Sequence, residues 1–193
     1  AFTHWESLKK IDAHIHILPD AVHKANPDSD DIWLCTDIHG YCAMMDDLHI
    51  EKAVIMPLND PWFMSMEFTI DAVHRNLQDM KNASPGRFYA FADIDTRNPA
   101  QSAEAIRKAL DGYGLDGIKI HPNNTRCALD DEYNAPIFAL AQQRNIPVAI
   151  HSYPNSAEGV CGAKRIGRIL ERYPGLRLIV AHMGGAQWEE LLD

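Results

Sequence analysis

Six short runs rich in isoleucine, valine, alanine and phenylalanine are the feature that most limits how this chain can fold. They lie at 11–17, 52–58, 87–94, 117–122, 147–152 and 176–183. Most are nearly continuous in apolar residues, as expected of strands that are covered on both faces in a parallel sheet. Four of the segments between them carry apolar residues at helical spacing, and these are Ile70, Val73, Leu77 and Met80; Ile106, Ala109 and Leu110; Ile137, Leu140 and Ala141; and Ile166, Ile169, Leu170 and Tyr173. The pattern predicts repeated β-α units and an α/β fold.

Length and composition limit the class of protein. With 193 residues, of which 46% are hydrophobic, we expect residues 1–193 to form one domain with a substantial core. The net charge of −9 argues against a nucleic-acid or anionic membrane partner and favours a small-molecule substrate. No apolar run approaches the ~20 residues of a membrane span. The four cysteines form no C-x-x-C pair, which favours a reducing, cytoplasmic location.

Polar residues at the ends of the later runs distinguish an open sheet from a barrel. Lys119 and His121 lie near the end of the fourth run, His151 at the end of the fifth and His182 at the end of the sixth. In an open sheet, at ~4.8 Å per strand, residues of the first and fifth strands lie too far apart to share a ligand. The carboxyl ends of strands converge in a barrel. We therefore expect a (β/α)₈ TIM barrel, of which this chain supplies about the first six β-α units.

The first run, "KIDAHIHI", carries two histidines on one face. Side chains alternate along a strand, so Asp12, His14 and His16 share a face. An isolated H-x-H pair is more often an ordinary hydrogen-bonded pair than a metal site. Together with His151, however, the two imidazoles predict a divalent metal site, with Zn²⁺ as the first choice and Mn²⁺ as the alternative. Asp12 is expected to orient a ligand histidine or a neighbouring group.

Four segments resemble the landmark strands of a known family. "IDAHIHI", "LDGIKIHPNN", "IPVAIHSYP" and "LIVAHMGG" are similar to those of the amidohydrolase superfamily, in particular the amidohydrolase-2 group of metal-dependent TIM barrels. The resemblance covers essentially the whole chain. It implies that His14, His16 and His151 bind the metal and that His182 lies close to the substrate or to a metal-activated water.

The resemblance also implies a part that this sequence lacks. In the family, an aspartate on the eighth strand completes the site as ligand and general acid/base. This sequence stops at Asp193, shortly after the sixth run. We therefore expect a barrel domain truncated after its sixth strand, with two unpaired edges at 11–17 and 176–183. Either the sequence is a fragment or a shortened form of a longer chain, or the barrel is completed by a second polypeptide or in a homo-oligomer.

Lys119 and His121 keep alternative interpretations. Lys119 either binds a substrate carboxylate, forms a structural ion pair, or carries the bridging carbamate that the resemblance associates with binuclear members. His121 either lines the pocket or is hydrogen-bonded in its rim. Loop residues are candidate substrate contacts: Asn123 and Tyr153 first, and also Asn59, Asp60, Asn124 and Arg126. The remaining histidines, His4, His23, His39, His49 and His74, are interpreted as surface or helix residues.

Three functions are consistent with these residues. The first is hydrolysis of a small-molecule amide, lactone or ester by a metal-activated water, assisted by His182. The second is metal-dependent, non-oxidative decarboxylation or hydration of a small carboxylic acid. The third, of another class, is a non-catalytic metal-binding or assembly protein.

Overall fold

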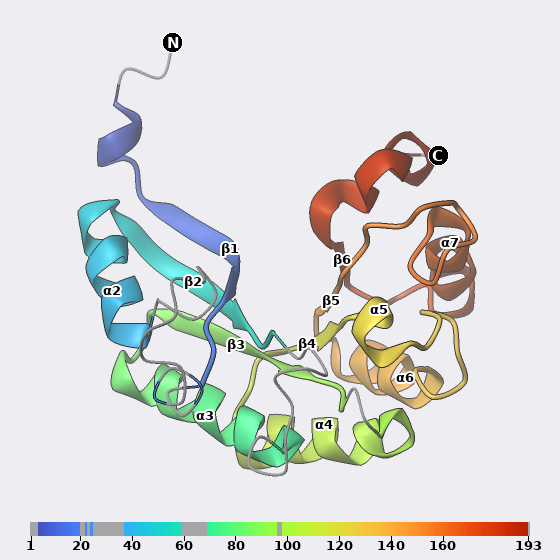
Figure 1. The fold of residues 1–193 in the computed structure, drawn as a ribbon, viewed down its shortest axis with the longest axis horizontal. Coiled ribbons are helices and arrows are strands. Elements are labelled where there is room, and N and C mark those ends of the chain that lie inside the picture. Colours follow the sequence, from blue (N-terminus) through green and yellow to red (C-terminus); the bar gives the residue numbers. More distant parts are fainter. Residues whose placement is uncertain are drawn as a thin grey trace.

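The computed structural model describes residues 4–19, 22, 24, 37–58, 69–95 and 98–192. Within these ranges, six parallel strands form one sheet in the order of the sequence (Figure 1). They are β1 (Lys10–His16), β2 (Ile50–Met56), β3 (Phe88–Asp93), β4 (Gly117–Ile120), β5 (Val148–Ile150) and β6 (Leu178–Val180). This curved sheet is a partial barrel, and it confirms the predicted fold of about six β-α units. His23, Cys35, Asn59 and Asp60 lie outside the described residues.

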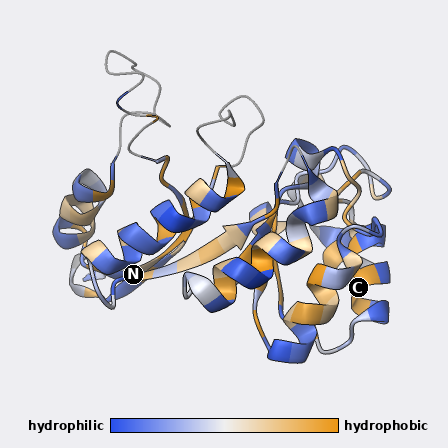
Figure 2. Ribbon diagram, turned by 90° about the horizontal axis from the view of Figure 1, so that it is seen from below, coloured by the Kyte–Doolittle hydropathy of each residue, from blue (hydrophilic) through white to orange (hydrophobic). Residues whose placement is uncertain are grey.

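Helices cover the outer side of the sheet (Figure 1). They are α2 (Ile38–Asp47), α3 (Ile70–Ala83), α4 (Ser102–Gly112), α6 (Ala135–Arg144) and α7 (Ala163–Arg172). The short helix α5 (Pro122–Thr125) follows β4, and the connections contain the 3₁₀ turns η1 (Trp5–Ser7), η2 (Pro99–Gln101), η3 (Ala181–Gln187) and η4 (Glu189–Leu191). Figure 2 shows strands that are largely hydrophobic and helices that alternate between hydrophobic and hydrophilic residues. The predicted helical segments correspond to α3, α4, α6 and α7. None of the helices in the described ranges is long and apolar enough to cross a membrane.

The sequence patterns did not identify α2. This helix buries Ile38, Tyr41 and Met45, which recur at intervals of three and four residues. It begins after Asp37, whose carboxylate accepts a hydrogen bond from the Gly40 backbone N–H at 2.7 Å. An N-terminal cap of this kind is a recognisable helix start.

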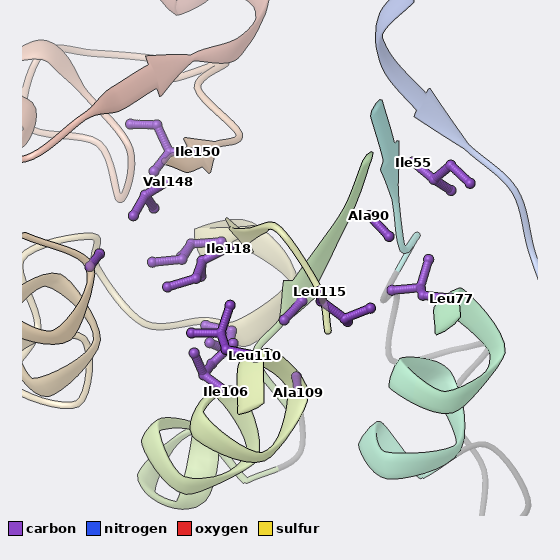
Figure 3. Packing of buried hydrophobic residues seen from close by; sticks show 14 of the residues in the cluster. Ile55, Leu77, Ala90, Ile106, Ala109, Leu110, Leu115, Ile118, Val148 and Ile150 are labelled. Atoms are coloured by element: carbon purple, nitrogen blue, oxygen red, sulfur yellow. The ribbon is translucent and has the colours of Figure 1, made fainter. Parts of the chain in front are cut away.

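The main core lies between the sheet and its helices. Ile118, Ile120, Val148 and Ile150 of β4 and β5 are fully buried there. Figure 3 shows part of this cluster, with Ile118 close to side chains that come from α4. Burying a side chain of this size contributes about 1.5–3 kcal/mol, so this layer is the main source of stability.

The inner face of the sheet holds a smaller apolar cluster. Met56, Phe91 and Ala149 are buried together on this face. The Phe91 ring lies over Gly117, where a Cβ atom would come within 2.4 Å of the ring. Only glycine at position 117 leaves space for that ring. Lys119 is two residues further along β4, on the same face, and the polar residues therefore begin directly above this apolar layer.

The side chains of β1 alternate between the two faces of the sheet as predicted, but one of these faces is partly exposed to solvent. Asp12, His14 and His16 are half-buried, whereas Ile15 is buried and Ile11 is 63% exposed. The register of β1 against β2 shifts between Asp12 and Ile15. β1 and β6 form the two edges of the described sheet, and Ile179 of β6 is likewise exposed.

Candidate metal and substrate site

The two histidines of β1 meet through their Nε2 atoms. These atoms lie 3.1 Å apart, and the Nδ1 atom of His16 lies 3.1 Å from the backbone oxygen of Met56. Because a carbonyl can only accept, His16 Nδ1 donates its hydrogen, and the lone pair of the neutral ring is on Nε2. Two imidazoles on one tetrahedral zinc ion, at ~2.0–2.1 Å each, have nitrogens about 3.3 Å apart. The pair therefore fits a shared metal.

Burial keeps these imidazoles neutral. Burial, followed by the positive charge of Lys119, lowers the pKa of His14 to about 3 and that of His16 to about 4. Burial, followed by the neighbouring His182, lowers the pKa of His151 to about 4. Neutral imidazole is the form that ligates a metal, so no proton has to leave these rings at neutral pH.

Asp12 acts on His14 through the backbone. Its Oδ1 accepts a hydrogen bond from the His14 backbone N–H at 3.2 Å, and its Oδ2 accepts one from the Tyr41 hydroxyl at 2.7 Å. The carboxylate therefore joins β1 to α2. It contacts the His14 main chain and the Tyr41 hydroxyl, so it lies against a ligand histidine and a neighbouring group.

Three further histidines follow β4, β5 and β6. The His151 ring stacks on the His121 ring, with centroids 3.9 Å apart and an interplanar angle of 16°. His151 Nδ1 lies 3.1 Å from His182 Nε2. The His14 and His182 ring centroids are 5.4 Å apart, so the group from β1 and the group from β4 to β6 are neighbours. The sheet thus brings all five predicted histidines to one end.

The histidines form two pairs at this end. His14 faces His16, and His151 faces His182. Across the part of the chain that the structure describes, no three His, Cys, Asp or Glu side chains are arranged to hold one metal ion. The assignment of His14, His16 and His151 as a ligand set therefore stays a prediction.

An unusual turn carries His182. Four consecutive residues, His182, Met183, Gly184 and Gly185, have positive φ angles of 61°, 51°, 71° and 58°. Glycine is favoured at position 184, because L residues rarely adopt its φ angle of 71° and a Cβ atom would also displace the Leu191 side chain, whose Cδ1 would lie 2.3 Å away. Non-glycine residues rarely adopt this conformation, and such strain is often found at functional sites.

The predicted substrate contacts differ in position. Tyr153 is 64% exposed, and its ring centroid lies 6.5 Å from that of His182, at the rim of the histidine group. Asn123 lies on α5, and its Oδ1 accepts a hydrogen bond from the Cys161 thiol at 3.5 Å. His121 Nδ1 accepts one from the Asn124 backbone N–H at 3.4 Å, so His121 caps α5. His121 is therefore both hydrogen-bonded and in contact with the site.

Lys119 is fully buried, and its Nζ lies 3.5 Å from His14 Nε2. Its neighbour Asp93, which none of the sequence motifs had indicated, is also fully buried. Asp93 is the last residue of β3, so the same strand-end rule that selected the histidines identifies it. His74, correctly expected on a helix, is buried, and its Nε2 lies 3.0 Å from the Asp93 backbone oxygen.

Solved structures resemble this fold at low sequence identity. An uncharacterised TIM-barrel protein from Bordetella bronchiseptica has a TM-score of 0.73 and 17% identity, with coverage of 96% of this chain and 70% of that one. The 5-carboxyvanillate decarboxylase of Sphingomonas paucimobilis has a TM-score of 0.70 and 18% identity, with coverage of 92% and 68%. A dihydroxybenzoic acid decarboxylase from Polaromonas sp. JS666, with bound manganese and the inhibitor 2-nitroresorcinol, has a TM-score of 0.67 and 17% identity, with coverage of 91% and 66%.

The sequence itself matches the family model Amidohydro_2, described as amidohydrolase, over residues 11–193. This range includes the six strands, apart from the first residue of β1, and every site residue that the sequence predicted. The chain belongs to the amidohydrolase family.

Proposed function

We propose that this chain carries part of a divalent-metal-dependent active site, with His14, His16 and His151 as metal ligands. The observation that carries the proposal is the 3.1 Å approach of His14 Nε2 to His16 Nε2, in rings held neutral by burial. His121 would support the third ligand by stacking on the His151 ring. A divalent metal bound there supplies Lewis-acid chemistry, by polarising a substrate oxygen or a water molecule.

We propose decarboxylation of a small carboxylic acid as the reaction. The buried Lys119 ammonium, beside His14, offers a positive charge to a substrate carboxylate inside the barrel. Tyr153 offers an exposed ring at the rim, and His182 offers an imidazole nitrogen that can hold or deliver a proton. The two decarboxylases with similar folds support this choice over the hydrolysis that the sequence analysis ranked first.

Hydrolysis of an amide, lactone or ester is the second candidate. It is supported by the contact between His182 Nε2 and His151 Nδ1, because an imidazole next to a metal ligand can take a proton from an attacking water. Hydration of a small acid uses the same groups. Imidazole ligands favour zinc, whereas the similar decarboxylase structure from Polaromonas contains manganese, so the choice of metal stays part of the proposal.

We further propose that additional polypeptide completes the barrel between β1 and β6. The similar structures support this, since the part they share with this chain is 66–70% of their own length. In this proposal residues 1–193 belong to one barrel domain, and the added part comes from the same chain, a second copy or another polypeptide. A cytoplasmic location, inferred from the cysteine spacing, is also a proposal.

Product analysis of the purified protein, loaded with Mn²⁺ or Zn²⁺, tests the reaction. Hydroxylated aromatic acids would be screened for CO₂ release, and lactones, esters and amides for acid release. Metal-dependent CO₂ release is the expected result, whereas acid release without CO₂ would support hydrolysis instead. Stoichiometric metal binding without turnover of either class, also after reconstitution with the rest of the barrel, would support a non-catalytic protein. Turnover that persists after chelation would contradict all metal-dependent alternatives.

A further inference from the structure

Asp93 and Lys119 are neighbours on adjacent strands. They are register partners in the parallel pairing of β3 with β4, so their side chains leave the sheet on the same side. Both side chains are fully buried. An acid and a base with no solvent exposure thus lie side by side on the inner face.

The Asp93 carboxylate is only half satisfied by hydrogen bonds. Its Oδ1 accepts the Ile94 backbone N–H at 2.7 Å, whereas its Oδ2 has no hydrogen-bond partner among the described residues. His74 contacts the backbone N and O of Asp93, at 3.1 and 3.0 Å, and not this oxygen. Burial raises the pKa of this carboxyl group to about 8, and the positive charge of Lys119 opposes that effect, so the charged form of Asp93 depends on Lys119.

The buried Lys119 ammonium likewise needs a counter-charge. Burial lowers the pKa of its ammonium, and the charge of Asp93 opposes that effect. Its Nζ lies 3.5 Å from His14 Nε2, a neutral imidazole that supplies no countercharge. Asp93, the register partner of Lys119 on β3, is the buried acid beside it.

We propose that Asp93 is a positioning residue for Lys119. Its carboxylate supplies the countercharge that holds the ammonium on the inner face of the barrel, next to His14. Lys119 therefore lies between a carboxylate on β3 and an imidazole on β1, and Asp93 determines how far the ammonium reaches into the site. This role is independent of the reaction proposed above, so a failure of either proposal leaves the other standing.

A double-mutant cycle tests the pairing. The side-chain amide oxygen that Asp93→Asn introduces can still accept the Ile94 N–H, so this variant removes the charge and keeps that hydrogen bond. We expect Asp93→Asn and Lys119→Met each to lower Tm by roughly 6–12 °C, because each leaves a buried charge unpaired. The Tm of the double variant should fall by clearly less than the sum of the decreases in the two single variants. Additive losses would overturn the proposal.

Asp116 provides the matched control. It precedes β4, and its carboxylate pairs with Lys81 at 2.7 Å rather than with Lys119. The decreases in Tm caused by Asp116→Asn and by Lys119→Met should therefore add in the double variant. If Asp93→Asn does not fold, the double variant with Lys119→Met should still fold, because neither buried charge remains. Failure of that double variant, when Lys119→Met alone folds, would also contradict the pairing.

A spectroscopic measurement separates positioning from a merely structural role. The protein has eight lysines, and with ¹³C at their ε carbons the NMR signal of Lys119 is identified by its loss in Lys119→Met. The Lys119 signal should shift in Asp93→Asn, stay near its original position in Asp93→Glu, and be unchanged in Asp116→Asn. A Lys119 signal that is the same in Asp93→Asn as in the parent protein would overturn the proposal.

Discussion

The Tyr41 hydroxyl donates a 2.7 Å hydrogen bond to Asp12 Oδ2, and this bond joins helix α2 to the strand that carries His14 and His16. Tyr41 is only 5% exposed, so the bond is shielded from water. The other oxygen of Asp12 holds the His14 backbone N–H. One carboxylate thereby links the packing of α2 to the placement of a candidate metal ligand.

Tyr41→Phe should weaken both stability and metal binding. The substitution leaves Asp12 Oδ2 without its donor, which costs about 1–3 kcal/mol of the free energy of unfolding. It also loosens β1 at His14, and we expect metal affinity to fall roughly tenfold. Urea denaturation and Mn²⁺ titration measure the two effects. Tyr133→Phe, at a tyrosine that is 45% exposed, is the control and should change neither.

Replacing both histidines of β1 should abolish specific metal binding. His14→Ala/His16→Ala removes the two Nε2 atoms that approach within 3.1 Å. Metal content after dialysis against Zn²⁺ or Mn²⁺ should fall from about one ion per intact site to background. His39→Ala, at an exposed histidine of α2, should keep the content of the parent protein. If the double variant retained the ion with unchanged affinity, the ligand assignment would be wrong.

Stability should fall as the pH decreases from 6.5 towards 4. His74 is buried, and burial lowers its pKa from 6.5 to about 4 in the folded protein. In this window the unfolded chain binds a proton that the folded protein excludes, so protonation favours unfolding. This difference in pKa corresponds to about 3 kcal/mol from His74 alone.

His74→Gln tests this assignment. Glutamine can still hydrogen-bond the Asp93 backbone but does not titrate, so the variant should lose less stability than the parent protein between pH 6.5 and 4. Urea denaturation at several pH values measures the slope. The half-buried site histidines act in the same direction, so part of the slope should remain. His39→Gln should leave the slope unchanged, and an equal slope in His74→Gln would refute the assignment.

Gly117→Ala should destabilise the inner face of the sheet. The new Cβ would lie 2.4 Å from the Phe91 ring, and displacing that ring costs about 1–3 kcal/mol of the free energy of unfolding. Phe91→Leu should recover part of the loss when combined with Gly117→Ala. Gly167→Ala on α7 is the control, because its Cβ would meet nothing within 4 Å, and it should stabilise the protein by about 0.5–1 kcal/mol. Thermal unfolding of these three variants, Gly117→Ala, Gly117→Ala/Phe91→Leu and Gly167→Ala, measures the differences.

Local patterns were sufficient for much of the fold. The apolar runs predicted β1 to β6, and the helical spacing around Val73 and Leu77 predicted α3, because strand and helix periodicities appear within a few residues of sequence. The positions of His14, His16, His151 and His182 at strand ends followed from the same runs. Parallel β-α units place the carboxyl ends of all strands together, so the sequence also indicated which end of the sheet carries the candidate site.

Tertiary packing decided how the site residues are oriented. Whether His151 faces His182 or the β1 histidines depends on ring rotation and on stacking against His121, and residues far apart in sequence set both. The neighbours Asp93 and Lys119 depend on the register of β3 against β4. Likewise, Ile11 lies in a hydrophobic run but is exposed, because β1 is an edge strand of the described sheet. Sequence periodicity specifies on which face of a strand a side chain lies, whereas long-range contacts specify which residues pack against that face.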